Sequence, residues 1–197
     1  MKWTSNGSGD VVKKKKNKTT PRVKAKPAAV KGKKAAAGDA FRLVAATRAD
    51  ADLWKSMRAD MYDGLDEASH DREIDAVLDS VDRACLLVYA PGGDAVGFLE
   101  VSLRNVVDGC VGSPVGYIEG IYLVPVFRGL GLGGVLIDEA ARWFAEHGCV
   151  EMATDTEIDD DGQQEFWSGL GFEETWRTVQ YRRPIASLPA RGRRPSR

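Results

Sequence analysis

The sequence has little of what metal centres, disulfide scaffolds and membrane spans require. Its three cysteines are widely spaced and odd in number, and with only two histidines they form no zinc-binding spacing. Such cysteines are typical of reduced thiols that act as small buried hydrophobic side chains. No apolar run approaches the roughly 18 residues of a membrane helix, and the N-terminal residues show no apolar core of a secretory signal. We therefore expect a cytoplasmic protein without a metal site or a membrane segment.

A net charge of −1 conceals a strong segregation of charge along the 197 residues. Residues 1–40 carry twelve Lys and Arg against two Asp, whereas residues 41–185 carry twelve Lys and Arg against twenty-seven Asp and Glu. The first segment is too poor in large apolar side chains to offset the entropy of ordering, so we expect a disordered basic tail. That tail is either simply solvated or in weak contact with a nucleic acid or another polyanion. The acidic domain over 41–185 attracts cationic partners, and residues 186–197 form a short basic C-terminal tail.

One stretch, residues 117–134, combines a strand, a glycine-rich turn and the start of a helix. Residues 117–124 are rich in β-branched and aromatic side chains, which is typical of a buried strand, and Pro125 ends it. Glycines follow Arg128, and apolar residues then recur with helical spacing from Leu132. Such a turn presents backbone N–H groups at a helix N-terminus, where they bind an anion, and glycine allows a phosphate to approach closely.

The glycine pattern differs from two common phosphate loops. A dinucleotide fold requires G-x-G-x-x-G near the start of a domain with an acidic residue about 20 positions later, and a Walker A loop requires a Lys after its glycines. This chain instead has Arg128-x-x-Gly131-x-Gly133 directly after the Val124-Pro125 pair, late in the domain. Strand, Val-Pro, loop and helix together resemble the acetyl-coenzyme-A pyrophosphate loop of the GCN5-related N-acetyltransferases (GNAT).

The remaining pattern predicts a single mixed α/β domain over residues 41–185. Strands are predicted over residues 41–46, 84–89, 95–104, 117–124 and 150–154, with one last strand or bent pair over 172–183. Helices are predicted from residue 50 or 52 to about 63, over 69–79, from 132 to about 148, and over 160–170. This order fits the GNAT fold. The resemblance implies a mixed, mostly antiparallel central sheet with helices on both faces, and central strands that splay around the pantetheine arm of the cofactor.

Further motifs along residues 41–185 resemble, in order and spacing, those of the aminoglycoside 6′-N-acetyltransferases. They are Trp54-x-x-Met57-Arg58-x-x-Met61-Tyr62, His70-x-x-Glu73-Ile74, Gly97-Phe98-Leu99-Glu100, Gly109-Cys110, Val115-Gly116-Tyr117-Ile118-Glu119-Gly120, Ala153-Thr154-Asp155 and Leu170-Gly171-Phe172-x-Glu174. The resemblance implies an acyltransferase that uses acetyl-CoA to acetylate a primary amine of a cationic aminoglycoside, and hence a role in antibiotic resistance. Family members are commonly dimers, so a homodimer is expected by analogy.

Glu119 is the best candidate for catalysis, because it lies inside an otherwise apolar strand where an unpaired charge is costly. The attacking amine must be neutral, although an alkyl ammonium has a pKa near 10.4, so the site needs a proton acceptor and carboxylates that hold the cation. The period of two predicts that Glu119 points the same way as Tyr117, Ile121 and Leu123. The resemblance implies that Glu119 contacts the aminoglycoside as a candidate general base. The alternative is a glutamate that is salt-bridged within the sheet, for example to Arg104.

Other residues are assigned to the acceptor side through the same resemblance. Asp155 ends the next strand and matches an aspartate that binds substrate amines, which makes it the second catalytic candidate; its alternative is a loop or capping aspartate. Trp54 and Tyr62 match aromatic positions on the first helix that line the substrate, as Tyr117 does on the strand, although Trp54 is nearly as well explained as a core residue. Glu100 could add negative potential.

For the cofactor, the resemblance implies a backbone cradle of N–H groups followed by contacts to pantetheine. The residues are Leu123, Val124, Arg128, Gly129, Leu130, Gly131, Leu132, Gly133 and Gly134, with Asp160 at a position where asparagine is frequent. Trp167 stands where many acetyltransferases have a tyrosine that protonates the leaving thiolate. An indole is a donor without a useful pKa, so no general acid is identified. Acetylation of a polyamine or a protein lysine, and a nucleic-acid-associated role through the basic tail, are the alternative functions.

Overall fold

The computed structural model describes residues 41–185, and the two predicted basic tails lie outside the described residues. Five strands form one sheet in their order along the chain. They are β1 (Arg42–Ala45), β2 (Arg83–Tyr89), β3 (Ala95–Arg104), β4 (Val115–Leu123) and β5 (Met152–Ala153). The first four pair antiparallel, and β5 joins β4 in parallel. The predicted mixed, mostly antiparallel sheet is therefore confirmed.

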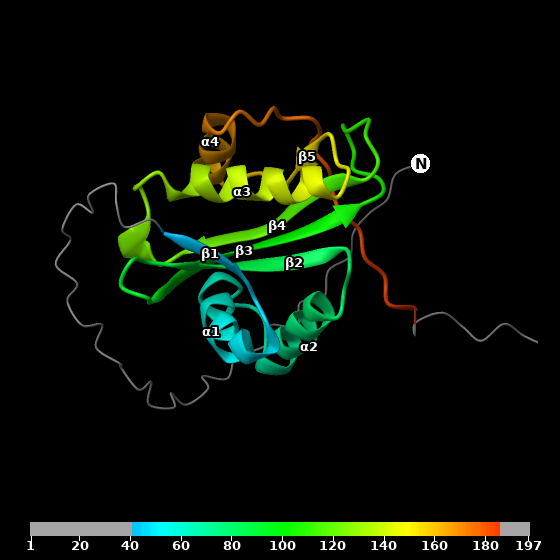
Figure 1. Ribbon diagram of the computed structural model, residues 1–197. Helices are drawn as coiled ribbons and strands as arrows, with labels where there is room; N and C mark the ends of the chain where they lie inside the picture. Colours follow the sequence, from blue (N-terminus) through cyan, green and yellow to red (C-terminus); the bar gives the residue numbers. More distant parts are fainter. Residues whose placement is uncertain (1–40, 186–197) are drawn as a thin grey trace, which may run out of the picture. The chain divides into compact units, whose positions relative to one another are not determined.

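Helices cover both faces of this sheet, as predicted (Figure 1). One face carries α1 (Ala51–Met61) and α2 (Glu67–Leu78), and the other carries α3 (Leu132–Glu146) and α4 (Asp161–Gly169). Two single-turn 3-10 helices, η1 (Arg48–Asp50) and η2 (Pro125–Phe127), precede α1 and the glycine-rich loop. Asp66 caps α2, because its Oδ1 accepts a hydrogen bond from the backbone N–H of Ser69 at 2.7 Å.

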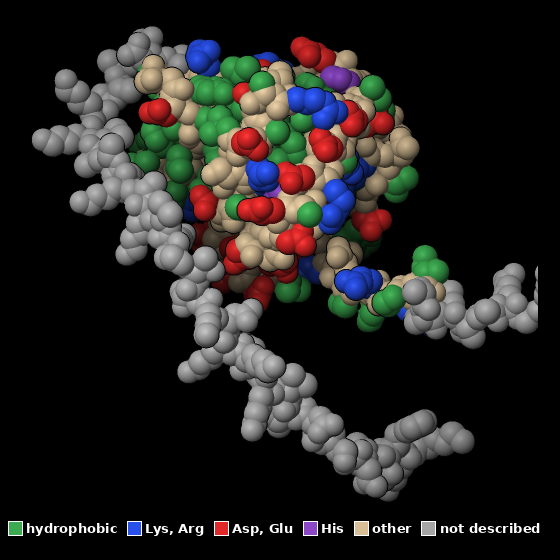
Figure 2. All heavy atoms as spheres, turned by 90° about the horizontal axis from the view of Figure 1, so that it is seen from below, with side chains coloured by type: hydrophobic (Ala, Val, Ile, Leu, Met, Phe, Trp, Pro, Cys, Tyr) green, Lys and Arg blue, Asp and Glu red, His purple; other side chains and the backbone are tan. Residues whose placement is uncertain are grey.

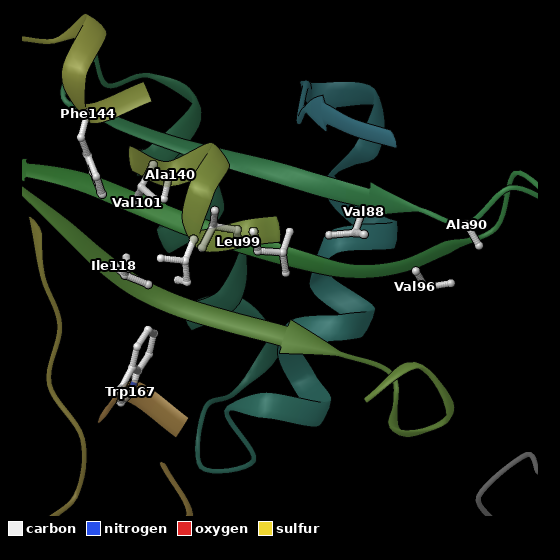
Figure 3. Packing of buried hydrophobic residues seen from close by; sticks show 11 residues of the cluster. Val88, Ala90, Val96, Leu99, Val101, Ile118, Ala140, Phe144 and Trp167 are labelled. Atoms are coloured by element: carbon white, nitrogen blue, oxygen red, sulfur yellow. The ribbon is translucent and has the colours of Figure 1, made fainter. Parts of the chain in front are cut away.

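Each face of the sheet has its own apolar core. On the α3 side, inward side chains of β3 and β4 meet the apolar stripe of α3 and Trp167 of α4; they include Leu99, Val101, Ile118, Ala140 and Phe144 (Figure 3). On the α1 side, a second cluster joins both helices to the sheet; its buried members are Trp54, Met57, Ile74, Cys85, Leu87, Phe98 and Tyr122. Alternation along the strands thus fills both layers, and a side chain's position along a strand indicates which helix pair it meets.

The central strands separate, as the resemblance implied. β4 and β5 pair at only two register positions, which end at Tyr117 on β4. One residue further, the hydroxyl of Thr154 still donates to the backbone carbonyl of Ile118 at 3.1 Å. Beyond that bond the two strands share no ladder. Asp155 and Glu119 follow directly after the point of separation.

The last predicted strand is wrong. Residues 172–183 have no regular secondary structure, and the large side chains that suggested a strand are exposed: Trp176 to 67%, Val179 to 76% and Tyr181 to 93%. β propensity reflects packing on neighbouring strands rather than a preference of the backbone alone. The only nearby edge strand, β5, is two residues long and pairs with β4, so this segment finds no ladder within residues 41–185.

Candidate active site

A β-bulge in β4 determines where Glu119 points. Glu100 of β3 lies opposite Gly120, and the next residue, Val101, lies opposite Ile118. Glu119 is therefore an extra residue with no partner in the ladder. A bulge of this kind redirects one side chain and breaks the alternation of the strand. Glu119 stands out as the exposed position in a strand that is otherwise buried or half-buried.

The bulge corrects the predicted orientation of Glu119. Ile121 and Leu123 pack against the core on the α3 side, so they do not share the face of Glu119. The carboxylate instead accepts a hydrogen bond from the buried hydroxyl of Ser102, a residue of β3 that lies on the α1 side of the sheet. Tyr117 shares this face with Glu119, as predicted, because Ile118 between them points into the α3-side core. The period of two therefore predicts side-chain orientation correctly before the bulge and incorrectly after it.

Glu119 is held by two neighbours on β3. Arg104 places Nη2 at 2.9 Å from each of the two carboxylate oxygens, and its Nε lies 3.3 Å from Oε1. The guanidinium also lies over the ring of Tyr117, with Cζ at 3.2 Å from the ring centroid. The Arg104 pairing that the sequence allowed is thus present. However, the side chains of Arg104 and Glu119 remain 39% and 31% exposed, so this pair lies at the surface of the site.

Tyr117 connects Glu119 to the second candidate carboxylate. Its hydroxyl donates a short hydrogen bond to Oδ1 of Asp155, which lies just after β5. Burial, and then this hydrogen bond, raise the pKa of Tyr117 well above its ordinary value, so the phenol stays protonated and a donor. Glu119 and Asp155 are therefore linked through Arg104 and Tyr117 where β4 and β5 separate. The structure brings together the two residues that were predicted for catalysis.

A cavity of about 410 Å³ opens beside Glu119, between the α1–α2 pair and the sheet. It is lined by Arg58, Tyr62, Leu65, Glu73, Val77, Arg83, Glu100, Val101 and Glu119. Acidic side chains are spread over this face of the molecule (Figure 2), and residues 51–79 contain nine Asp and Glu against three Lys and Arg. The summed field of such a surface concentrates cations at the cavity.

Tyr62, which was predicted to lie on the acceptor side, lines the cavity next to β4. Its hydroxyl lies 3.5 Å from Oε2 of Glu100 and 3.4 Å from the backbone carbonyl of Glu119. Only glycine fits beneath it, because a Cβ on Gly120 would lie 2.3 Å from the phenolic oxygen. Burial, and then the charge of Glu100, raise the pKa of Tyr62, so this phenol also stays neutral.

Trp54 is not a substrate-lining residue. Its side chain is fully buried in the α1-side core, and its indole Nε1 donates to Oε1 of Glu100 at 2.7 Å. Glu100 also forms an ion pair with Arg58, and both side chains are buried. Arg58 reaches Glu73 with its other terminal nitrogen. The sequence analysis missed Arg58, although a charged residue on the apolar face of α1, four positions after Trp54, was a signal of a buried partner.

The glycine-rich loop before α3 has the geometry of an anion site. Gly129 and Gly131 have φ values of 73° and 79°, a region that favours glycine, and a Cβ on either would meet nothing within 4 Å. The loop surface is therefore open. Among the described residues, the backbone N–H groups of residues 129–131 donate no hydrogen bond of good geometry, and the first turn of α3 adds further unpaired N–H groups.

Comparison with known proteins identifies this arrangement. Residues 51–172 match the model of the Acetyltransferase (GNAT) family. The chain is 36% identical over 141 residues to an aminoglycoside N(6′)-acetyltransferase type 1 of Stenotrophomonas maltophilia, which covers 71% of this chain and 91% of that protein. It is 36% identical over 137 residues to the enzyme of that name from Salmonella typhimurium (69% and 94% covered).

The chain belongs to the GNAT acetyltransferase family. A solved relative, AAC(6′)-Iy in complex with the bisubstrate analog CoA-S-monomethyl-acetylneamine, superimposes with a TM-score of 0.70 at 32% identity, over 74% of this chain and 99% of that one. The described residues of the acetyltransferase contain no helix able to cross a membrane and no cluster of His, Cys, Asp and Glu able to hold a metal. All three of its cysteines are unpaired.

The loop of this GNAT protein suits the pyrophosphate of coenzyme A, since it combines an open surface, glycines with positive φ and unpaired N–H groups at a helix start. Gly133 and Gly134 lie in the first turn of α3, and a Cβ on Gly133 would lie 2.7 Å from the ring of Phe166 on α4. Arg128 braces the loop, because its Nε donates to the carbonyl of Leu123 at 2.8 Å.

Two residues predicted to contact the cofactor already have hydrogen-bond partners within the chain. The backbone N–H of Val124 donates to Val96 at 2.9 Å, and its carbonyl accepts from Phe127, so Val124 has no free donor. Asp160 caps α4: one carboxylate oxygen accepts from the backbone N–H of Gln163 and the other from its side-chain amide, each at 2.9 Å. Both residues are therefore explained by local structure, through η2 and the start of α4.

Trp167 lies on α4 beneath β4, with its ring directed toward Ile118 (Figure 3). It is 7% exposed and packs edge-on against Phe166 and Phe172. Within the described residues its indole N–H has no hydrogen-bond partner. Trp167 thus supplies packing volume and an N–H donor. It supplies no acid for the leaving thiolate, as the sequence also indicates.

Proposed function

We propose that this acetyltransferase is an aminoglycoside 6′-N-acetyltransferase. It transfers the acetyl group of acetyl-CoA to the primary 6′-amine of a cationic aminoglycoside and releases coenzyme A. The observation that carries the proposal is the group of Glu119, Tyr117 and Asp155 at the separation of β4 and β5, beside a cavity under the acid-rich helices α1 and α2. The names of the relatives, which match over most of their length, support the same acceptor.

The acceptor residues divide the work of binding a cation and removing its proton. Asp155, kept in place by the hydroxyl of Tyr117, holds an ammonium of the aminoglycoside. Glu119 accepts a proton from the attacking amine, directly or through water, because the amine is a nucleophile only when neutral. The neutral nitrogen then attacks the thioester carbonyl, the carbon–sulfur bond breaks as the amide bond forms, and the remaining proton of the nitrogen passes through water to the departing thiolate. No covalent enzyme intermediate is required, in keeping with a site that has no cysteine.

Arg128 and the residues of the glycine loop bind the other substrate. Backbone N–H groups of residues 129–134 hold the pyrophosphate, and the loop directs the thioester arm toward the separation of β4 and β5. Because these contacts come from the backbone, substitutions that change the conformation at the glycines matter more than changes of side-chain chemistry at Leu130 or Leu132.

Thiol release by the purified full-length protein tests the function. With acetyl-CoA and kanamycin or tobramycin, Glu119→Gln should lower kcat/KM by about 10²–10⁴-fold, the contribution of general acid–base catalysis. Glu139→Gln is the matched control, because Glu139 is also a partly exposed glutamate paired with an arginine, on α3. It should stay within about twofold of wild type. Absence of thiol release by wild type with either acceptor would overturn the proposal.

A polyamine or a protein lysine is the competing acceptor, since an acidic face attracts any polycation. The rigid group of two carboxylates around Tyr117 favours an acceptor with several fixed amines over a flexible chain. An acceptor panel distinguishes them: a polyamine that exceeds every aminoglycoside in kcat/KM by a large factor would replace the antibiotic as the substrate.

Three further expectations concern the setting of the enzyme. We infer a cytoplasmic location from the unpaired cysteines. A homodimer is supported by the exposed apolar residues of 172–185, and sedimentation of the full chain tests it. Contact of residues 1–40 with a polyanion is tested by deleting residues 1–38 and measuring the salt dependence of DNA binding. Unchanged binding after the deletion would refute that contact.

A further inference from the structure

Arg104 occupies the position at Glu119 where an acceptor cation would bind. Nη2 lies 2.9 Å from both carboxylate oxygens, and Nε lies 3.3 Å from Oε1. The shorter contacts thus come from one nitrogen placed between both oxygens, a position that a primary ammonium can also take. The second terminal nitrogen of Arg104 takes no part in the pair.

Glu119 does not need Arg104 to stay in place. The hydroxyl of Ser102, only 3% exposed, donates to Oε1 from the floor of the site and orients the carboxylate. Oε2 accepts a hydrogen bond from Arg104 alone. If the guanidinium left, Glu119 would remain oriented by Ser102, with one oxygen open to a new donor.

The guanidinium of Arg104 can move away from Glu119 along the ring of Tyr117. Arg104 is the last residue of β3, and its guanidinium already stacks on the ring of Tyr117. The flat ring allows the guanidinium to slide while it keeps its cation–π contact. With both partners about one-third exposed, the ion pair is of the weak surface kind. The buried pair of Arg58 and Glu100 is the opposite case, since both of its members are sealed in the core.

We propose that Arg104 is a displaceable internal cation that competes with the acceptor for Glu119 and thereby sets the acceptor preference. This inference rests on the proposed function. An acceptor with one ammonium gains little binding free energy, because its contact with Glu119 only replaces the contact of the guanidinium. An acceptor with several ammonium groups also binds Asp155 and the cavity, so it displaces Arg104 with a net gain in binding free energy. Arg104 is thus a specificity residue that favours polycations. The carboxylate of Glu119 binds either Arg104 or the acceptor.

Steady-state kinetics of Arg104→Gln with tobramycin test the inference. Removal of the competing charge should lower the KM for tobramycin by about three- to tenfold, the range that corresponds to a weak surface pair plus relief of charge repulsion. The kcat should stay within about twofold, because Ser102 keeps Glu119 oriented. Arg104→Met, which preserves the aliphatic stem over Tyr117, should behave in the same way. Arg104→Lys keeps the charge and should keep a KM near that of wild type.

Arg42→Gln is the matched control, because Arg42 also stacks on a tyrosine of the sheet, Tyr89, at 5.4 Å, but is far from the site on β1. It removes the same charge and should leave the KM unchanged. Calorimetric binding of tobramycin to each variant, with thermal melting to verify folding, gives the affinity without turnover. An unchanged or raised KM in both Arg104→Gln and Arg104→Met, with wild type active, overturns this inference alone. An inactive wild type overturns the proposed function and this inference with it.

Discussion

Replacing Glu100 by Gln should destabilise the protein strongly without removing the chemistry. Glu100 is 4% exposed and pairs with Arg58, which is 3% exposed. The amide oxygen of Gln can still accept the hydrogen bond from Trp54, so the substitution removes the negative charge and little else. The guanidinium of Arg58 then remains buried and keeps only Glu73, whose side chain is about half exposed.

The expected loss in the free energy of unfolding follows from leaving the buried charge of Arg58 without Glu100. Breaking a buried ion pair on one side typically costs about 3–5 kcal/mol, because an uncompensated charge stays in the interior. Glu73 remains in place, so we expect about 3 kcal/mol, at the low end of that range. For a domain of this size, about 3–4 °C of Tm accompany each kcal/mol, which predicts a fall of about 10 °C. Urea unfolding and thermal melting at pH 7 measure both quantities.

A control and a double substitution make the test specific. Glu119→Gln removes a charge from an exposed pair and should cost about 1 kcal/mol or less, while it abolishes most of the activity. Arg58→Met combined with Glu100→Gln removes the buried charge altogether and should be at least as stable as Glu100→Gln alone. If Glu100→Gln costs less than about 1 kcal/mol, or if the double variant is the least stable of the three, the reasoning about the buried pair is wrong.

Three further predictions concern other parts of the fold. Gly116→Ala should lower stability by about 1–3 kcal/mol, because its Cβ would lie 2.2 Å from the ring of Phe144, and Phe144→Leu should restore part of the loss; a neutral Gly116→Ala would contradict this. Gly131→Ala, at φ 79°, should raise the KM for acetyl-CoA about tenfold and leave the acceptor KM within about twofold; an equal rise in both would show general damage. Hydrogen bonds from the Ser69 side chain and backbone hold the pKa of Asp66 below its ordinary value, so its stabilisation is complete above about pH 4 and is lost as the pH falls through the lowered pKa. Asp66→Ala should therefore melt below wild type at pH 7, by a margin that shrinks as the pH falls through the lowered pKa, whereas Asp66→Asn, whose amide oxygen still caps the helix, should show the smaller deficit at pH 7.

Local patterns were enough to predict most of the architecture. The strand predicted over 95–104 matches β3 at both ends, and the helix that follows the glycine loop begins at Leu132, as expected. In these segments the periodicity, the flanking turns and the packing all favour the same structure. The loop from Arg128 was predictable for the same reason, because positive φ values at Gly129 and Gly131 are a backbone requirement that only glycine meets easily.

Predictions failed where the outcome depended on a partner distant in sequence. Residues 172–183 have the alternation of a strand, but a strand exists only if another strand pairs with it. The bulge at Glu119 arises from the register between β3 and β4, which no pattern within β4 reveals. Trp54 was nearly as well explained as a core residue or a substrate residue, and its contact with Glu100, 46 positions away, decided for the core.

Glu100 and Glu119 show why a charged residue in an apolar strand identifies a site only after its partners are known. Both interrupt buried strands on the same face of the sheet, and both pair with an arginine. Glu100 is sealed against Arg58, so it contributes little free negative potential to the cavity, contrary to the suggestion from the sequence. Glu119 is displaced by the bulge to the rim, where its arginine is exposed and can be exchanged for a substrate cation. Depth in the core therefore separates the structural carboxylate from the one proposed to act on the acceptor, and depth is a property of the assembled layers rather than of either strand alone.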